Sequence, residues 1–167
     1  MTPNFTILAL CSFIPFLVAT IWYHSSLFGG DTWNKLVGLT DQQSKTKIKP
    51  VKLIISILLN FIIALGLAQI TLHQMGVFSL VGGNAEALKI GTGAAFLAEY
   101  GKNHLDFGHG FFHGILAAIL FVLPVLGYAT IFERKSAKYL LVNFGFWTIS
   151  LALMGGVIAA WGGVPIV

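Results

Sequence analysis

The sequence predicts an all-α polytopic membrane protein, and three observations carry that prediction. Of the 167 residues, 56% are hydrophobic and only 10% are charged, unlike a typical soluble domain. Four stretches contain no Asp, Glu, Lys or Arg, and each supplies the roughly 20 apolar residues that a spanning helix needs. These stretches are continuously apolar, which favours helices over the alternating strands of a membrane barrel. They cover residues 2–30, 53–85, 107–132 and 139–167.

We expect four transmembrane helices, arranged as an antiparallel bundle in a single integral membrane domain, 1–167. The expected spans are residues 5–28, 51–72, 110–132 and 138–161. Pro15 and Pro124 should kink the first and third spans, because proline lacks the N–H that the helix needs and clashes with the preceding turn.

The charge of the gaps predicts an orientation. Eight of the ten basic residues lie in the first and third gaps: Lys35, Lys45, Lys47, Lys49, Lys52, Arg134, Lys135 and Lys138. The positive-inside rule therefore makes these two loops cytoplasmic and places both termini outside. The net charge of +4 then favours contact with anionic lipid headgroups at these loops, and it is poor evidence for nucleic acid.

The first gap contains clear helix start and stop signals. A short turn at 32–37 should stop at Gly38, and Thr40 with Gln43 matches a capping box for a second short helix that ends near Ile48. Pro50 suits the first position of the second span. The third gap is only a few residues long, so spans three and four should form an antiparallel hairpin.

The second gap is the least ordinary region. Residues 73–113 hold four of the five histidines and three of the six acids, and they are too polar to span a bilayer. Residues 85–100 carry enough apolar side chains for a short interfacial helix. We therefore expect short interfacial helices in loops 1 and 2.

Part of this segment has the residue types of a metal site. The candidate ligands are His73, His104, Asp106, His109 and His113. His109 and His113, four residues apart, would share one helix face about 6 Å apart. Such nitrogen and oxygen donors suit zinc, iron, copper or nickel. We favour a structural role, since histidines at a membrane surface often cap helices, bind headgroups or hydrogen-bond carbonyls, and metal ligation is the alternative.

Small and amide residues inside the spans predict close helix packing. The candidates are Gly110, Gly114, Gly155, Gly156, Asn60 and Asn143. Glycines four apart let another helix approach closely, and amides form hydrogen bonds between helices. The partner helix could belong to this bundle or to a second copy.

The sequence offers no support for catalysis, since it has no phosphate loop and no nucleophile triad. Away from their ends, the spans contain no acid and no permanent cation, which counts against ion-coupled transport. We therefore expect a non-enzymatic, self-associating or accessory membrane subunit. A metal-binding membrane protein and an oligomeric channel or permease for a small solute remain the alternatives.

Several motifs resemble domain-of-unknown-function family 1761. They are Trp22-Tyr23, Leu27-Phe28-Gly29, 33–40, Leu123-Pro124, 132–135, 139–143, Met154-Gly155-Gly156 and Ala160-Trp161. The resemblance implies a four-helix protein of the bacterial inner membrane and no established activity. The histidine-rich outer segment looks longer than the family's usual connection.

Overall fold

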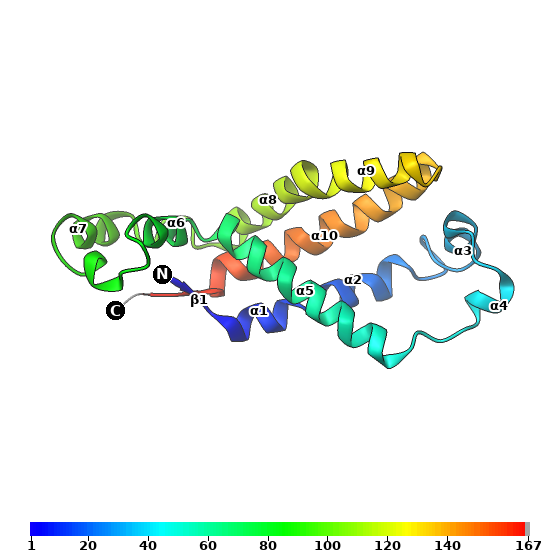
Figure 1. The fold of residues 1–167 in the computed structure, drawn as a ribbon, viewed down its shortest axis with the longest axis horizontal. Helices are drawn as coiled ribbons and strands as arrows, with labels where there is room; N and C mark the ends of the chain where they lie inside the picture. The colour runs from blue at the N-terminus through cyan, green and yellow to red at the C-terminus, as the bar shows by residue number, and fades with distance from the viewer. Residues whose placement is uncertain (166–167) are drawn as a thin grey trace.

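The computed structural model describes residues 1–165, which form helices, short connections and one pair of two-residue strands. Four helical segments are long and apolar enough to cross a membrane: Phe5–Trp22, Pro50–Thr71, Phe107–Phe132 and Ala137–Trp161. This confirms the predicted all-α class and the four spans (Figure 1).

The first span is shorter than predicted, because its helix ends at Trp22 and does not continue to Phe28. Beyond that point the chain turns back on itself, and the N–H of Gly29 donates to the carbonyl of His24. The hydropathy pattern predicts a longer span because residues 23–30 contain no Asp, Glu, Lys or Arg. The third span begins at Phe107, three residues earlier than expected, because Asp106 caps it.

Both predicted kink positions coincide with departures from α geometry. The first span consists of α1 (Phe5–Cys11) and α2 (Ile14–Trp22), with Pro15 in the first turn of α2. The third consists of α8 (Phe107–Ala117), a π-helical turn η2 (Ala118–Val122) and α9 (Leu123–Phe132), which contains Pro124. A proline has no N–H to donate to the carbonyl four residues earlier, so the regular pattern of helical hydrogen bonds is interrupted there.

The first gap forms the two short helices expected from its sequence. The first, α3, is Asp31–Val37 and ends at Gly38, whose φ of 78° is left-handed. The second, α4, is Asp41–Ser44, and both hydrogen bonds of the Thr40–Gln43 capping box are present. This helix ends before the predicted Ile48. Pro50 then opens α5, Pro50–Thr71.

An aromatic stack holds α3 against the bundle. The Trp33 ring lies 4.5 Å from Tyr23 and 6.3 Å from Tyr139, measured between centroids. The Lys135 ammonium donates to the Val37 carbonyl at 3.1 Å. Contacts from three separate segments thus anchor the first loop beside the connection between α9 and α10 (Ala137–Trp161) (Figure 1).

The second gap and both termini lie at the opposite end of the molecule (Figure 1). This gap contains α6 (His73–Leu80), a 3₁₀ turn η1 (Ala85–Leu88) and α7 (Gly91–Tyr100). The sequence did not predict α6. It also did not predict the strand pair in which β1 (Thr2–Pro3) runs antiparallel to β2 (Gly163–Val164).

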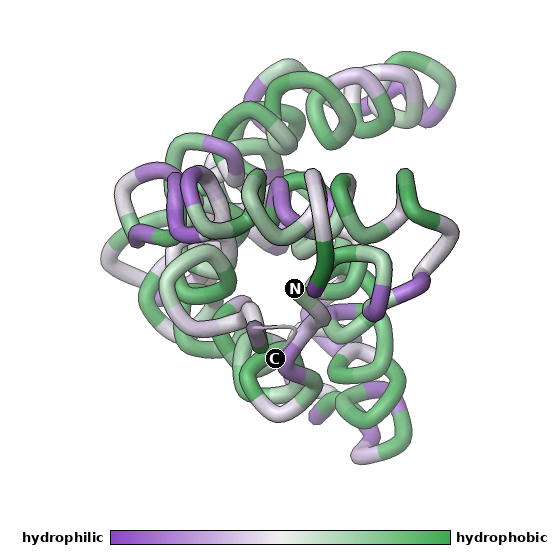
Figure 2. Tube along the Cα trace, turned by 90° about the vertical axis from the view of Figure 1, so that its left-hand side faces the viewer, coloured by the Kyte–Doolittle hydropathy of each residue, from purple (hydrophilic) through white to green (hydrophobic). Residues whose placement is uncertain are grey.

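The most buried span is α10, Ala137–Trp161, with half of its apolar window covered. The other spans leave large side chains uncovered, such as Leu17, which is 66% exposed, and Ile131, 73% exposed. Hydrophobic residues dominate the helices along the trace (Figure 2), and many of the large ones are exposed. Such an apolar exterior is what a chain surrounded by lipid needs.

Glycines set the closest helix contact. A Cβ on Gly110 would collide with the Gly155 carbonyl, and one on Gly114 would collide with the Leu151 carbonyl. The partner's residue number falls from 155 to 151 as the residue number on α8 rises from 110 to 114. This helix pair is therefore antiparallel. Gly156 packs beneath the Phe107 ring.

Candidate metal centre

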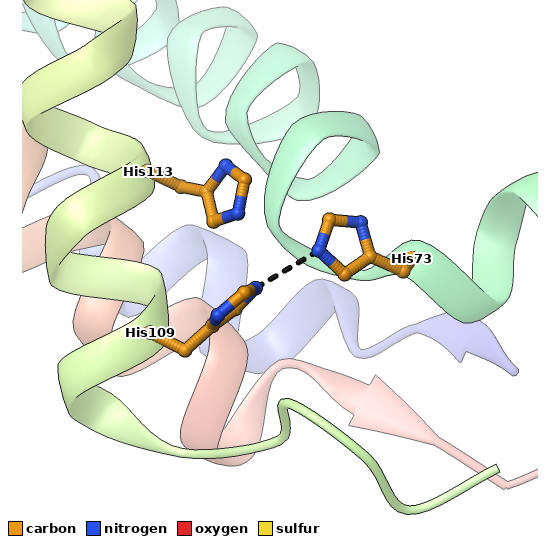
Figure 3. A group of neighbouring side chains, drawn as sticks. All are labelled: His73, His109 and His113. Atoms are coloured by element: carbon orange, nitrogen blue, oxygen red, sulfur yellow. Dashed lines mark hydrogen bonds between the residues drawn. The ribbon is translucent and has the colours of Figure 1, made fainter. Parts of the chain in front are cut away.

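Three histidine side chains converge at the end of the molecule that carries the termini. One nitrogen from each of His73, His109 and His113 lies within 4.8 Å of the other two. His73 Nε2 is 2.9 Å from His109 Nε2. Figure 3 shows the three rings turned toward one common point. The rings are accessible, since His73 is exposed and the other two are half-buried.

Two of the ligands share a helix face because of their spacing. His109 and His113 lie one turn apart on α8, and their ring centroids are 4.4 Å apart. The adjacent face of α8 carries Gly110 and Gly114, which seat the helix on α10. Because consecutive helix residues are about 100° apart, this seating turns the two imidazoles toward the end of α5.

The third ligand comes from a break between helices. Leu72 is fully buried and has non-helical backbone angles, φ −96° and ψ 82°, which end α5 and start α6. His73 is the first residue after this break. Its ring centroid lies 5.0 Å from both His109 and His113. The buried Leu72 therefore anchors the backbone that presents His73 to α8.

Asp106 has a different role from the one expected. It is the N-cap of α8, and its Oδ1 accepts the backbone N–H of His109 at 2.8 Å. A carboxylate at a helix N-terminus also complements the helix dipole. Asp106 is not part of the convergent set, and instead it fixes the turn from which His109 projects.

His104 lies beside the cluster. Its ring stacks on His109, with centroids 4.5 Å apart and an interplanar angle of 28°. The ring is 5.8 Å from that of His73. The backbone of His104 is left-handed, with φ of 63°, an uncommon conformation for a residue with a side chain. His104 is thus a neighbour of the cluster from a tight loop turn.

The donor set fits a transition metal by distance as well as by type. Two nitrogens held about 2.0–2.1 Å from one tetrahedral zinc ion lie about 3.3 Å apart. The closest nitrogen pair is already nearer than this, at 2.9 Å. All three nitrogens lie within 4.8 Å of one another, so the widest pair must approach by up to about 1.5 Å to reach the zinc geometry. Three imidazoles leave at least one coordination position open.

A cavity of about 260 Å³ adjoins the cluster. Its lining includes His73 and His104, together with Val77, Phe96 and Tyr100 from α6 and α7. A metal held by the three histidines would therefore lie beside a mostly apolar space.

The predicted amides make different hydrogen bonds. Asn60 is buried, and its Nδ2 donates to the Ser12 carbonyl at 3.0 Å, joining α5 to the break in the first span. Asn143 donates instead to Tyr139 of its own helix, at 2.8 Å. Asn143 therefore makes no link between helices within residues 1–165.

A family model described as "Protein of unknown function (DUF1761)" matches residues 6–159. The chain belongs to the DUF1761 family. No curated protein and no solved structure matches it. Membership therefore confirms the resemblance seen in the sequence and gives this DUF1761 protein no activity. Its matched region includes all three convergent histidines.

Proposed function

We propose that this DUF1761 protein is a multi-pass membrane protein that binds one transition-metal ion through His73, His109 and His113. The observation that carries the proposal is the convergence of three imidazole nitrogens within 4.8 Å. Two of the ligands come from α8 and one from the start of α6, so the site joins two parts of the chain separated by 36 residues.

The chemistry of the three donor nitrogens restricts which metal ions the site would bind. Three neutral nitrogen ligands suit zinc, copper, iron or nickel, and they are poor ligands for calcium or magnesium, which prefer oxygen. Water or the neighbouring His104 would complete the coordination sphere. The free His73–His109 pair shares a proton in a hydrogen bond, and metal binding would displace that proton.

The proposed setting is the bacterial cytoplasmic membrane, as the family resemblance implies, with the spans in an antiparallel bundle. One observation and one general rule support an outward-facing metal site. The basic loops, which contain α3, α4 and residues 133–138, lie at the end opposite the histidines (Figure 1). By the positive-inside rule these loops would be cytoplasmic, with α3 and α4 at the membrane interface beside anionic headgroups.

Self-association as an accessory subunit is the second proposal, and α5 favours it. The small residue Gly66 and the amide Gln69 are both exposed on this span. A polar side chain that faces lipid gains a hydrogen bond when a second helix covers it. The mass of the particle in lipid nanodiscs tests this proposal, since a monomer mass would reject it.

Elemental mass spectrometry of tag-free protein tests the metal proposal. We expect about one equivalent of a transition metal in the native chain, and less than a tenth of that in a His109→Ala/His113→Ala double variant. His24→Ala is the matched control, because His24 lies outside the cluster and bonds Ser26. Metal-free native protein after growth and reconstitution with each of the four metals would reject the proposal.

A further inference from the structure

A second cavity lies within the membrane-spanning part of the molecule, and none of the clustered histidines lines it. It is a groove of about 490 Å³ between α2, α5 and α10. Its walls are mainly apolar: Phe16, Ala19, Leu59, Ile63, Phe146 and Trp147. Ligand sites in helical bundles have this size and this kind of lining, with a few fixed polar groups.

Besides the Trp147 indole, two polar side chains line the groove, Ser56 and Asn60. The Ser56 hydroxyl donates to the Lys52 carbonyl of its own helix, whereas Asn60 is only 6% exposed and faces another helix. Its Nδ2 donates to the Ser12 carbonyl at 3.0 Å. That carbonyl is free because of the break before Pro15, where the N–H of Phe16 bonds Phe13 instead. Since a carbonyl can only accept, it fixes the orientation of the amide. Among residues 1–165, no group donates to Asn60 Oδ1, and protein atoms do not fully cover this oxygen.

The depth of Asn60 makes this unpaired oxygen costly. Asn60 follows Pro50 by ten residues and precedes Thr71 by eleven, so it lies about 15 Å from each end of α5. This is the middle of a hydrocarbon core about 30 Å thick. Water is scarce there, and an unsatisfied polar group costs several kcal/mol. A donor must therefore come from a molecule within the membrane.

We infer that the groove binds a membrane-soluble molecule with an apolar body and one hydroxyl group, whose O–H donates to Asn60 Oδ1. An ordinary acyl chain fills apolar space but carries no donor at this depth. A second copy of the chain would have to place a helix about 10 Å wide in the groove. A groove of about 490 Å³ is too small to hold a helix along its length. The inference does not depend on the metal site.

Photolabelling in nanodiscs tests the site with defined probes. The purified full chain is irradiated with a 12-carbon alcohol that carries a diazirine, or with the corresponding alkane, and labelled peptides are mapped. We expect the alcohol to label residues 15–19, 56–63 and 146–147 about three- to tenfold more than the alkane does. That factor corresponds to one hydrogen bond in a membrane. Unlabelled dodecanol should compete.

Two variants separate the groove from the lipid-facing surface. Ala19→Phe fills the groove and should reduce labelling by the alcohol to the level of the alkane. Leu17→Phe adds bulk on the same helix at a side chain outside the groove, and it should leave labelling unchanged. Asn60→Leu should abolish the difference between the probes, and thermal unfolding verifies that each variant is folded.

Equal labelling by the two probes in the native chain would overturn the inference, because the groove would then be ordinary lipid-facing surface. A dimer mass in nanodiscs, together with protection of these peptides from both probes, would also overturn it. In that case a second copy of the chain would occupy the groove.

Discussion

The contact between α8 and α10 makes a quantitative prediction, because Gly114 has no room for a side chain. A Cβ at this position would lie 2.6 Å from the Ala152 Cα, whereas ordinary contacts begin at 3.4 Å. The Leu151 carbonyl lies closer still, so in the variant Gly114→Ala the two helices must separate by at least about 0.8 Å. The obstructing atoms are backbone, so no side-chain rotation relieves the clash. Overpacking of this kind costs about 1–3 kcal/mol.

Gly127→Ala is the matched control for this prediction. Gly127 lies in the same span and has nothing within 4 Å of its Cβ position. Each substitution also gains helix propensity, by up to about 1 kcal/mol, so this gain cancels in the comparison. Denaturant unfolding in detergent, followed by circular dichroism, should show Gly114→Ala less stable than Gly127→Ala by about 1–3 kcal/mol. Equal stabilities would refute the claim that glycine sets the helix spacing.

Three further predictions concern the loops at the two ends. Asp106→Ala should cost about 1 kcal/mol of stability in the metal-free protein, whereas Asp106→Asn keeps the cap and should cost only a few tenths; thermal unfolding measures both. Lys135→Ala should speed hydrogen exchange of residues 31–38 about two- to tenfold, and the exposed Lys138→Ala should not. His104→Ala should retain about one equivalent of metal by elemental analysis, since three other histidines hold it, and loss of the metal would place His104 among the essential ligands.

The parts of the fold that depend on local composition could be predicted. The spans follow from apolar length, and α3 and α4 follow from Gly38 and the Thr40–Gln43 box. The parts that depend on distant contacts could not. The strand pair joins Thr2 to Val164, and no local pattern of two residues signals such a pairing. The helix α6 was missed because His73 and Gln74 make its start look like a loop.

The candidate site divides in the same way. The four-residue spacing of His109 and His113 is a local pattern, and it is enough to indicate a shared helix face. The approach of His73 is tertiary, and it depends on the break at the buried Leu72 and on the position of α8. Asp106 was assigned to the metal by residue type, yet its place three residues before His109 is also an N-cap pattern, and the local hydrogen bond determines its role.

The position of the three ligands links metal binding to helix packing. His73 follows α5 directly, while His109 and His113 belong to α8, so an ion bound by all three holds these segments together. A ligand at 100 times its dissociation constant stabilises the native state by about 2.7 kcal/mol. Gly114 lies beside His113 and fixes α8 against α10, so a shift of about 0.8 Å there moves two of the three donors. Loss of the metal and loss of the glycine contact should therefore be non-additive, as expected for changes that share one structural element. The same glycines that pack the bundle thereby control the geometry of the site.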